Sequence, residues 1–474
     1  MAKSFKAPEI EIPEEDFAAN DRLSRAEQVR SLAGLLMQLS SPMVVAIDAP
    51  WGAGKTTFVR MLQTELRGRG FAAVYYNAWE SDFAPDPLVA FLGEIDQEIR
   101  SLVEADGQRV KAWESLRSLT GKVVRHGVPA AIKLATYSIV DADKITEELL
   151  ADSLGGVSSD LVTEYQESKE AIATFKRSVE SVLSGLNDEA EHLVVIIDEL
   201  DRCRPTFSIE LLERVKHLFG VPGVVFVLAV DRQQLSHGIN AVYGSGFDSQ
   251  GYLRRFIDFT YKLQTSDITP FVEGLLVSFG LDDVLDSRQR HRVFTNERQT
   301  IIALLKLFVA EWGLTLRQLE QLVAQLNIVI RSGDSNQYLF PPVALFLLLL
   351  RMLDEPTYER YLSSQHDPAV ILRYLGLKYG DTFTNRPDHL AWVEGGFLGT
   401  YKHEAQASAA TLTNDRHLAA DAEGEDKRAR EYHRLVLRCA SEPLGSSFEH
   451  RNPLHIDHLI ARIEFLEQID TDRH

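Results

Sequence analysis

The sequence has little cysteine and no long apolar run, and each shortage excludes a class of protein. Cys203 and Cys439 are the only cysteines among 474 residues, so we expect neither a disulfide framework nor a cysteine-rich zinc module. This usage is typical of a reducing cytoplasm. The longest apolar stretch, 338–350, has 13 residues and contains two prolines, well short of the roughly 20 residues that a membrane helix needs. We therefore expect no membrane partner.

Positive charge is also scarce. Lys and Arg number 50 against 69 Asp and Glu, which gives a net charge of −19. Such a field repels polyanions unless a local basic patch opposes it, so direct nucleic-acid binding is disfavoured. The first 16 residues carry several acids and no apolar run, so we do not interpret them as a secretory signal.

Five short apolar runs alternate with stretches of helical periodicity. The runs are 43–47, 72–76, 193–197, 224–230 and 259–263. This alternation predicts an α/β fold in which helices cover a parallel sheet. More than 100 residues separate the second run from the third. That is too long for a simple crossover, so we expect a helical insertion over about 85–190.

The chain length predicts two or three domains. We expect a lead-in and helix over 1–40, a core over 41–265, a helical domain packing on the core over 266–360 and a C-terminal helical region over 361–474. Within the last region, residues 404–430 are rich in Ala, Asp, Glu, Thr and Asn. With so few large apolar residues, this segment is predicted to be a loop or mobile linker.

The clearest motif is Ala49-Pro-Trp-Gly-Ala-Gly-Lys-Thr-Thr57, between a predicted strand and a predicted helix. It is a P-loop, except that Ala49 stands where the pattern has its first Gly. A loop with small side chains lets backbone N–H groups surround a phosphate beside a helix N-terminus. The residues expected to bind nucleotide are Trp51, Gly52, Ala53, Gly54, Lys55, Thr56 and Thr57. Lys55 would reach the β and γ phosphates and assist catalysis, and the Thr56 hydroxyl would bind Mg²⁺.

A second motif is the apolar run Val194–Ile197, which ends in Asp198 and Glu199. At the carboxyl end of a strand, Asp198 is suited to hold Mg²⁺, as the acid of a Walker B motif does. Glu199 would then position or deprotonate the attacking water. The alternative is that both acids only solvate the strand end. Two half-motifs on separate strands support each other, so we favour the catalytic interpretation.

Further segments carry a family resemblance. They are Asp198-Glu-Leu-Asp-Arg-Cys-Arg-Pro205, Trp51-Gly-Ala-Gly-Lys-Thr56, Asn77-Ala-Trp-Glu80, Leu228-Ala-Val-Asp-Arg232 and Tyr252-Leu-Arg-Arg255. Together they resemble the KAP family of P-loop NTPases over roughly residues 10–360. The resemblance implies an ASCE-type, STAND- and AAA-related ATPase core with a helical region behind it. Bacterial members of that family are often linked to phage defence.

Many KAP members carry membrane helices between their two Walker motifs. The corresponding stretch here, 123–140, contains Arg125, Pro129 and Lys133, which a bilayer-spanning helix would rarely tolerate. We therefore expect a soluble member. Family members more often have Asp where Glu199 stands, and Glu is the usual catalytic acid of the wider class.

The resemblance assigns four more residues, three of them with an ordinary alternative. Asp231 matches a polar sensor of the γ-phosphate or simply caps the next helix. Arg254 and Arg255 match an arginine finger for a neighbouring subunit or are ordinary exposed arginines. Arg317 matches a sensor arginine from the helical domain, although Leu316 replaces the Pro that usually precedes it.

Three residues near the motifs have less definite roles. Asp201 and Arg202 could pair with each other or with a neighbouring subunit, or they could form a buried structural ion pair. Trp79 is expected to pack in the core, with packing under the nucleotide loop as the alternative.

Two hypotheses for function follow. In the first, the chain binds and hydrolyses ATP·Mg²⁺ as a conformational or assembly switch in an antiphage-defence or signalling complex. In the second, nucleotide serves assembly only, and the chain is a scaffold that recruits a separate effector protein. ATP is preferred over GTP because no base-reading Asn-Lys-x-Asp segment is found in place. Both hypotheses imply self-association.

Overall fold

The fold is known from a computed structural model. It describes residues 21–39, 42–104, 107–126, 159–184, 192–264, 267–288, 296–332, 340–380, 383–422, 424, 426–441 and 456–470. The chain divides into two compact units, one within residues 10–266 and one within 267–474. The predicted lead-in over 1–20 lies outside the described residues. None of the helices in the described ranges is long and apolar enough to span a bilayer.

The first unit is built on a five-stranded parallel sheet. Its strands are β1 Met43–Asp48, β2 Ala72–Asn77, β3 Leu193–Asp198, β4 Val224–Val230 and β5 Phe259–Lys262. They lie in the order β2-β3-β4-β1-β5, and every pairing is parallel. β4 therefore separates β1 from β3, which is the ASCE arrangement. The prediction of an α/β fold with a parallel sheet is confirmed.

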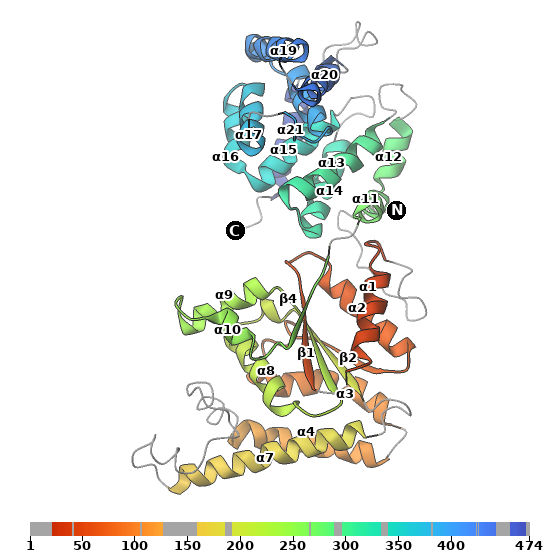
Figure 1. The fold of residues 1–474 in the computed structure, drawn as a ribbon, viewed down its shortest axis with the longest axis vertical. Helices are drawn as coiled ribbons and strands as arrows, with labels where there is room; N and C mark the ends of the chain where they lie inside the picture. Colours follow the sequence, from red (N-terminus) through yellow and green to blue (C-terminus); the bar gives the residue numbers. More distant parts are fainter. Residues whose placement is uncertain are drawn as a thin grey trace. The chain divides into compact units, whose positions relative to one another are not determined.

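Helices cover both faces of this sheet (Figure 1). The helices of this unit are α1 Ala26–Leu36, α2 Lys55–Gly68, α3 Pro87–Val103, α4 Gly107–His126, α7 Ser159–Leu183, α8 Pro205–Leu218, α9 Arg232–Tyr243 and α10 Ser249–Leu253. The short 3-10 helix η2 spans Leu200–Arg202. In β1, Val45 and Ile47 pack with α1 and α2, whereas Val44 and Ala46 pack with helices of the other face. This alternation follows from the two-residue repeat of a strand.

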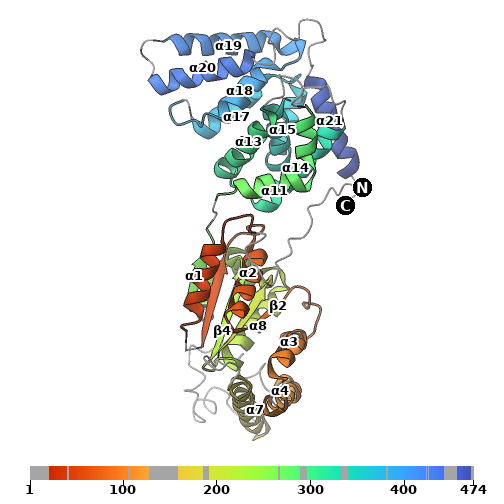
Figure 2. The ribbon, with the colours of Figure 1, turned by 90° about the vertical axis from the view of Figure 1, so that its right-hand side faces the viewer.

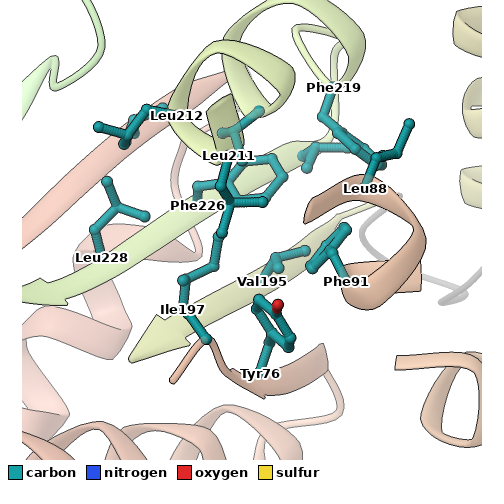
Figure 3. Close-up of a cluster of buried hydrophobic side chains, with 14 of the residues drawn as sticks. Tyr76, Leu88, Phe91, Val195, Ile197, Leu211, Leu212, Phe219, Phe226 and Leu228 are labelled. Carbon is teal, nitrogen blue, oxygen red and sulfur yellow. The ribbon is translucent and has the colours of Figure 1, made fainter. Parts of the chain in front are cut away.

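The larger core cluster lies between the sheet and helices α3 and α8 (Figure 3). Phe91 on α3 meets Tyr76 on β2 edge to face, with ring centroids 5.3 Å apart. Phe219 packs against Phe226 on β4 in the same way, at 5.6 Å. These buried contacts fix the strand ends relative to the helices, and so they fix where the loops after the strands can lie.

The predicted insertion is helical throughout its described part. Helices α4 and α7 lie side by side in both views (Figure 1, Figure 2). Trp113 on α4 is buried, and its indole N–H donates to Asp96 on α3 at 2.6 Å. Phe175 and Val179 on α7 join the core cluster under the sheet. The insertion therefore packs against the core cluster that also includes residues of α3 and α8.

The second unit is helical in all its described parts. Its helices are α11 Thr269–Ser278, α12 Leu281–Arg288, α13 Glu297–Trp312, α14 Leu316–Arg331, α15 Pro341–Leu353, α16 Glu355–Ser363, α17 Pro368–Tyr379, α18 Leu390–Gly399, α19 Gln406–Asp421, α20 Lys427–Ser441 and α21 Ile456–Asp470, with the 3-10 helix η4 at His403–Ala405. The apolar run 338–350 mostly becomes α15, whose residues Val343–Leu350 are buried in this unit.

Residues 404–430 are not a loop, contrary to the prediction from composition. Most of this segment forms α19, and α20 begins at Lys427. Alanine has the best helix propensity of all residues. The buried side of α19 includes the small residues Ala409 and Ala420. Arg416 on α19 also pairs with the buried Glu394 at 2.6 Å. A helix that packs through small and charged residues gives a weak apolar signal, which is why the prediction was wrong.

Candidate functional site

The loop between β1 and α2 has the backbone shape that its glycines permit. Gly52 and Gly54 have φ values of 76° and 79°, a region that residues with a Cβ rarely adopt. Ala49 is not among the positive-φ residues of the described chain. It is buried, and its N–H donates to the carbonyl of Val230 at 3.3 Å. Alanine can therefore replace the first P-loop glycine without backbone strain.

Backbone amides and one ammonium group converge at this loop. The first bond of α2 runs from the N–H of Phe58 to the carbonyl of Gly54 at 3.1 Å, so the amides of Lys55, Thr56 and Thr57 have no acceptor within the helix. Lys55 is buried, and its Nζ donates to the carbonyl of Ala49 at 2.8 Å. Free amides beside a lysine at a helix N-terminus favour a bound anion.

The sheet brings the two acids of β3 to the same edge. Asp48 at the end of β1 pairs in register with Val230, and Asp198 at the end of β3 pairs with Ala229. Both strands therefore finish beside the end of β4. The Thr56 hydroxyl reaches the two acids: it donates to Glu199 Oε1 at 3.3 Å, and it lowers the pKa of Asp198. The loop and the two acids therefore lie together at this end of the sheet.

Asp198 is fully buried and held by fixed donors. The Tyr75 hydroxyl donates to Oδ2 at 3.0 Å, and the backbone N–H of Glu199 donates to Oδ1 at 2.9 Å. Burial raises the pKa of Asp198 above its ordinary value, and hydrogen bonds from Thr56 and Tyr75 only partly oppose this. A carboxylate in such a place is costly unless a cation lies close to it.

Glu199 has an unusual backbone and a divided environment. Its φ is 62°, in the left-handed region, which is uncommon for a residue with a side chain and is concentrated at functional sites. Its carboxylate forms an ion pair with Arg202. Burial and the charge of Asp198 raise the pKa of Glu199, whereas Arg202 lowers it. A raised pKa makes a carboxylate a stronger base at neutral pH.

The donor set fits a magnesium ion that is shared with phosphate. Asp198 and Thr56 offer oxygen ligands, which Mg²⁺ prefers, and a divalent cation would offset the cost of burying the Asp198 carboxylate. No cluster of three or more His, Cys, Asp or Glu able to hold a metal occurs within the described ranges. The site is thus too poor in ligands to cage a metal alone, as is usual where Mg²⁺ keeps waters and phosphate oxygens.

Asp201 joins the loop to β4, a role that the sequence did not reveal. Its Oδ2 accepts from the Trp51 indole at 2.6 Å and from the N–H of Asp231 at 2.8 Å, and it lies 3.8 Å from Lys55 Nζ. Asp201 therefore pairs with Lys55 and not with Arg202. Its spacing from the Walker acids gave the only signal.

Trp79 is 53% exposed, so the prediction that it packs in the core is wrong. The Arg202 guanidinium lies 5.6 Å from the centre of its ring. The N–H of Trp79 donates to the Asn77 side chain at 3.1 Å. This turn after β2 holds the indole outward, where it contacts the arginine that pairs with Glu199.

Arg25 was also missed by sequence reasoning. It is buried, and its Nη1 donates to the carbonyls of Ala53 and Gly54 at 2.9 and 3.5 Å, while Nη2 reaches the carbonyl of Gln264 at 3.4 Å. Burial lowers the pKa of Arg25 to about 10, which leaves it charged at neutral pH. A single arginine before a helix carries no sequence signal for a contact with a loop 28 residues away.

Of the other residues assigned by resemblance, Asp231 touches this cluster, because its N–H donates to Asp201 Oδ2 at 2.8 Å. Asp231 is buried and caps α9 by accepting from the N–H groups of Gln233 and Gln234. Arg254 and Arg255 are exposed and follow α10, just before β5. Because β5 runs parallel to β1, they lie near the edge of the sheet opposite to the loop. Arg317 is exposed in the first turn of α14, in the second unit.

The burial of Asp198 predicts that the Asp198→Asn variant unfolds at a higher temperature than the unaltered protein at pH 7. Its folded pKa is raised, so the carboxylate destabilises the fold once pH exceeds its unfolded pKa of about 3.9, fully so above the folded pKa. The gain should therefore vanish near pH 4. Thermal unfolding of the unliganded protein at both pH values measures this.

The matched control is Asp283→Asn on α12, which changes an exposed carboxylate in the same way. It should leave the midpoint nearly unchanged. A lower midpoint for Asp198→Asn than for the unaltered protein at pH 7 would show that burial of the charge is not a cost.

Comparison with known proteins agrees with the site. The sequence matches the profile of the KAP family P-loop domain over residues 25–332. It is 21% identical over 268 residues to the phage T7 exclusion protein of Escherichia coli (strain K12), a match that covers 55% of this chain and 35% of that relative. The chain thus spans only about a third of the length of this relative.

Solved structures were found at low similarity. AMPPCP-bound DnaA from Aquifex aeolicus has a TM-score of 0.28 at 14% identity over 98% of both chains. The Aeropyrum pernix ORC2 protein has a TM-score of 0.26 at 14% identity over 94% of both chains. Scores of this size carry no argument about function. The family profile spans well over half of the chain, and with the loop, the acids and the strand order described above it shows that the chain belongs to the KAP family of P-loop NTPases.

Proposed function

We propose that this chain binds ATP with Mg²⁺ and hydrolyses it as a conformational or assembly switch. The observation that carries the proposal is the meeting of the glycine loop with Asp198 and Glu199 around the Thr56 hydroxyl. ATP is preferred because the sequence has no guanine-reading segment in place. The family supports nucleotide binding in general; turnover and the switch are the proposal.

The loop would bind the phosphates of the nucleotide. Gly52 and Gly54 permit its shape, and the amides of Lys55, Thr56 and Thr57 would donate to phosphate oxygens. Lys55 would exchange its contacts with Asp201 and with the carbonyl of Ala49 for the β and γ phosphates. Trp51 and Ala53 would contribute the remaining backbone of the cradle.

Glu199 would act on the attacking water. For this its carboxylate must leave Arg202, its present ion-pair partner. Glu199 would accept the proton of a water whose oxygen bonds to the γ-phosphorus, while the bond from that phosphorus to the bridging oxygen breaks and ADP departs. Thr56 and Asp198 would hold Mg²⁺, which neutralises charge on the β and γ oxygens. Asp231, now a helix cap, and Arg317 are proposed as sensors of the γ-phosphate.

The biological setting is inferred from the named relative. That protein is called a phage T7 exclusion protein, which supports a role for this chain in antiphage defence or signalling. The sequence shows no nuclease, protease or deaminase constellation, so we infer that a separate effector protein performs the damaging step. We place the assembly in the cytoplasm, in keeping with the low cysteine content.

Two substitutions test hydrolysis. Lys55→Ala should weaken ATP binding by about 10- to 100-fold, because it removes a charged donor to phosphate. Glu199→Gln should keep ATP binding but reduce turnover by about 10²- to 10⁴-fold, because an amide cannot accept the proton. Equilibrium titration of ATP and release of inorganic phosphate measure the two effects.

Lys216→Ala is the control. Lys216 pairs with Asp258, which precedes β5, and the start of β5 lies at the end of the sheet opposite to the loop. It should match the unaltered protein in both assays. Unaltered turnover in both Lys55→Ala and Glu199→Gln would contradict the proposal. If no form turns ATP over but ATP still changes the mass of the assembly, the chain is a nucleotide-dependent scaffold.

The position of Arg254 and Arg255 predicts that they act on a neighbouring chain. No hydrogen bond or ion pair ties their side chains to another part of the chain that the structure describes. Replacing both with Ala should reduce turnover by about 10³-fold or more without loss of ATP binding. Lys55→Ala chains keep both arginines, so mixing the two inactive proteins should restore turnover, as measured by phosphate release.

A mixture of Lys55→Ala with Asp198→Asn is the control. Both of these chains have a damaged site, so their mixture should stay inactive. Full turnover by the arginine variant alone would contradict an arginine finger at these positions.

A further inference from the structure

Tyr75 is a residue that no motif assigns, yet its hydroxyl reaches the proposed metal ligand. It lies on β2, beside β3, and its hydroxyl donates to Asp198 Oδ2 at 3.0 Å. The other oxygen, Oδ1, accepts from the N–H of Glu199 at 2.9 Å. A carboxylate oxygen has two acceptor positions, so each oxygen keeps one that is not used by these donors. The two bonds together fix the plane of the carboxylate.

The ring of Tyr75 is itself held in place from the helix that follows the loop. The guanidinium carbon of Arg60, on α2, lies 3.3 Å from the centre of the ring. Arg60 also donates to Gln63 on the same helix at 3.4 Å. The Tyr75 side chain therefore connects two elements. Arg60 of α2 contacts its ring, and Asp198 of β3 accepts from its hydroxyl.

We propose that Tyr75 is a positioning residue that orients Asp198 for a divalent cation bound together with nucleotide. The inference rests on the proposed function, because it assigns Tyr75 a part in the Mg²⁺·ATP site. Partners that orient a metal ligand contribute to affinity without touching the metal, and their loss commonly costs about 10- to 100-fold in metal affinity. The phosphate cradle around Lys55 does not include Tyr75, so binding of nucleotide without metal should not need the hydroxyl.

The test compares the affinity for a non-hydrolysable ATP analogue in Mg²⁺ and in EDTA. The ratio of the two dissociation constants is the gain due to the metal. Tyr75→Phe keeps the ring under Arg60 and removes only the donor, so it should reduce this gain by about 10-fold or more while affinity in EDTA stays the same. Isothermal titration calorimetry gives both constants without turnover.

The neighbouring residue supplies a matched control. Tyr76 also lies on β2, but it belongs to the core of the other face (Figure 3). Its hydroxyl bonds the Ser81 hydroxyl at 2.7 Å. Tyr76→Phe should leave the gain unchanged. In an Asp198→Asn background, Tyr75→Phe should have no further effect on the gain, because the group that it orients is no longer a carboxylate. A merely structural role would instead add to the loss.

The outcomes separate the two claims. An equal gain in the unaltered protein and in Tyr75→Phe would contradict the role of Tyr75 and leave the proposed function standing. An equal additional loss in the Asp198→Asn background would also contradict it. Absence of any metal-dependent gain in the unaltered protein would contradict the proposed function and this inference with it.

Discussion

The site depends on a carboxylate that the sheet buries completely. Asp198 ends β3, and a single strand, β4, separates β3 from β1, the strand that enters the loop. Its burial raises its pKa, so the folded chain holds a charge that is poorly solvated. A cation that binds together with phosphate would offset this cost. An exposed carboxylate would be solvated by water and would need no cation. The strand order, which buries Asp198, thus contributes to the affinity that we propose for Mg²⁺·ATP.

The charged groups around Asp198 already have partners within the chain. Lys55 contacts Asp201 and the carbonyl of Ala49, and Glu199 contacts Arg202. In our account a nucleotide exchanges these contacts for phosphate and water. The exchange changes the partners of Asp201, which also holds the Trp51 indole and the start of α9 through Asp231. Contacts of this kind give a nucleotide a physical route to move segments beyond the loop.

The sequence predicted the parts of the site whose residue types are dictated by local chemistry. Gly52 and Gly54 could be predicted because a phosphate-binding loop favours residues without a side chain, and β3 could be predicted because buried parallel strands are continuously apolar. Arg25 and Tyr75 could not be predicted. Their contacts join positions 28 and 123 residues apart, and neither residue type is unusual where it stands. Only the assembled fold gives such residues a role.

The two wrong expectations have a common cause. Trp79 has a large, mostly apolar side chain, yet the turn after β2 leaves it exposed to solvent, beside the Arg202 guanidinium. Helix α19 has few large apolar residues, yet it packs through alanines and through the Arg416–Glu394 pair. In both cases hydrophobicity alone was a poor guide to burial, because the turn geometry or a buried ion pair decided the outcome.

The central claim is that metal and nucleotide occupy one site where each assists the other. Thermal unfolding in four solutions tests it most directly: buffer with EDTA, Mg²⁺ alone, a non-hydrolysable ATP analogue with EDTA, and the analogue with Mg²⁺. A ligand that binds the folded state raises the unfolding midpoint, by an amount that grows with the ratio of its free concentration to its dissociation constant. Mg²⁺ and the analogue together should raise the midpoint by more than the sum of their separate effects. Separate effects that simply add, or no shift with the analogue at all, would contradict it.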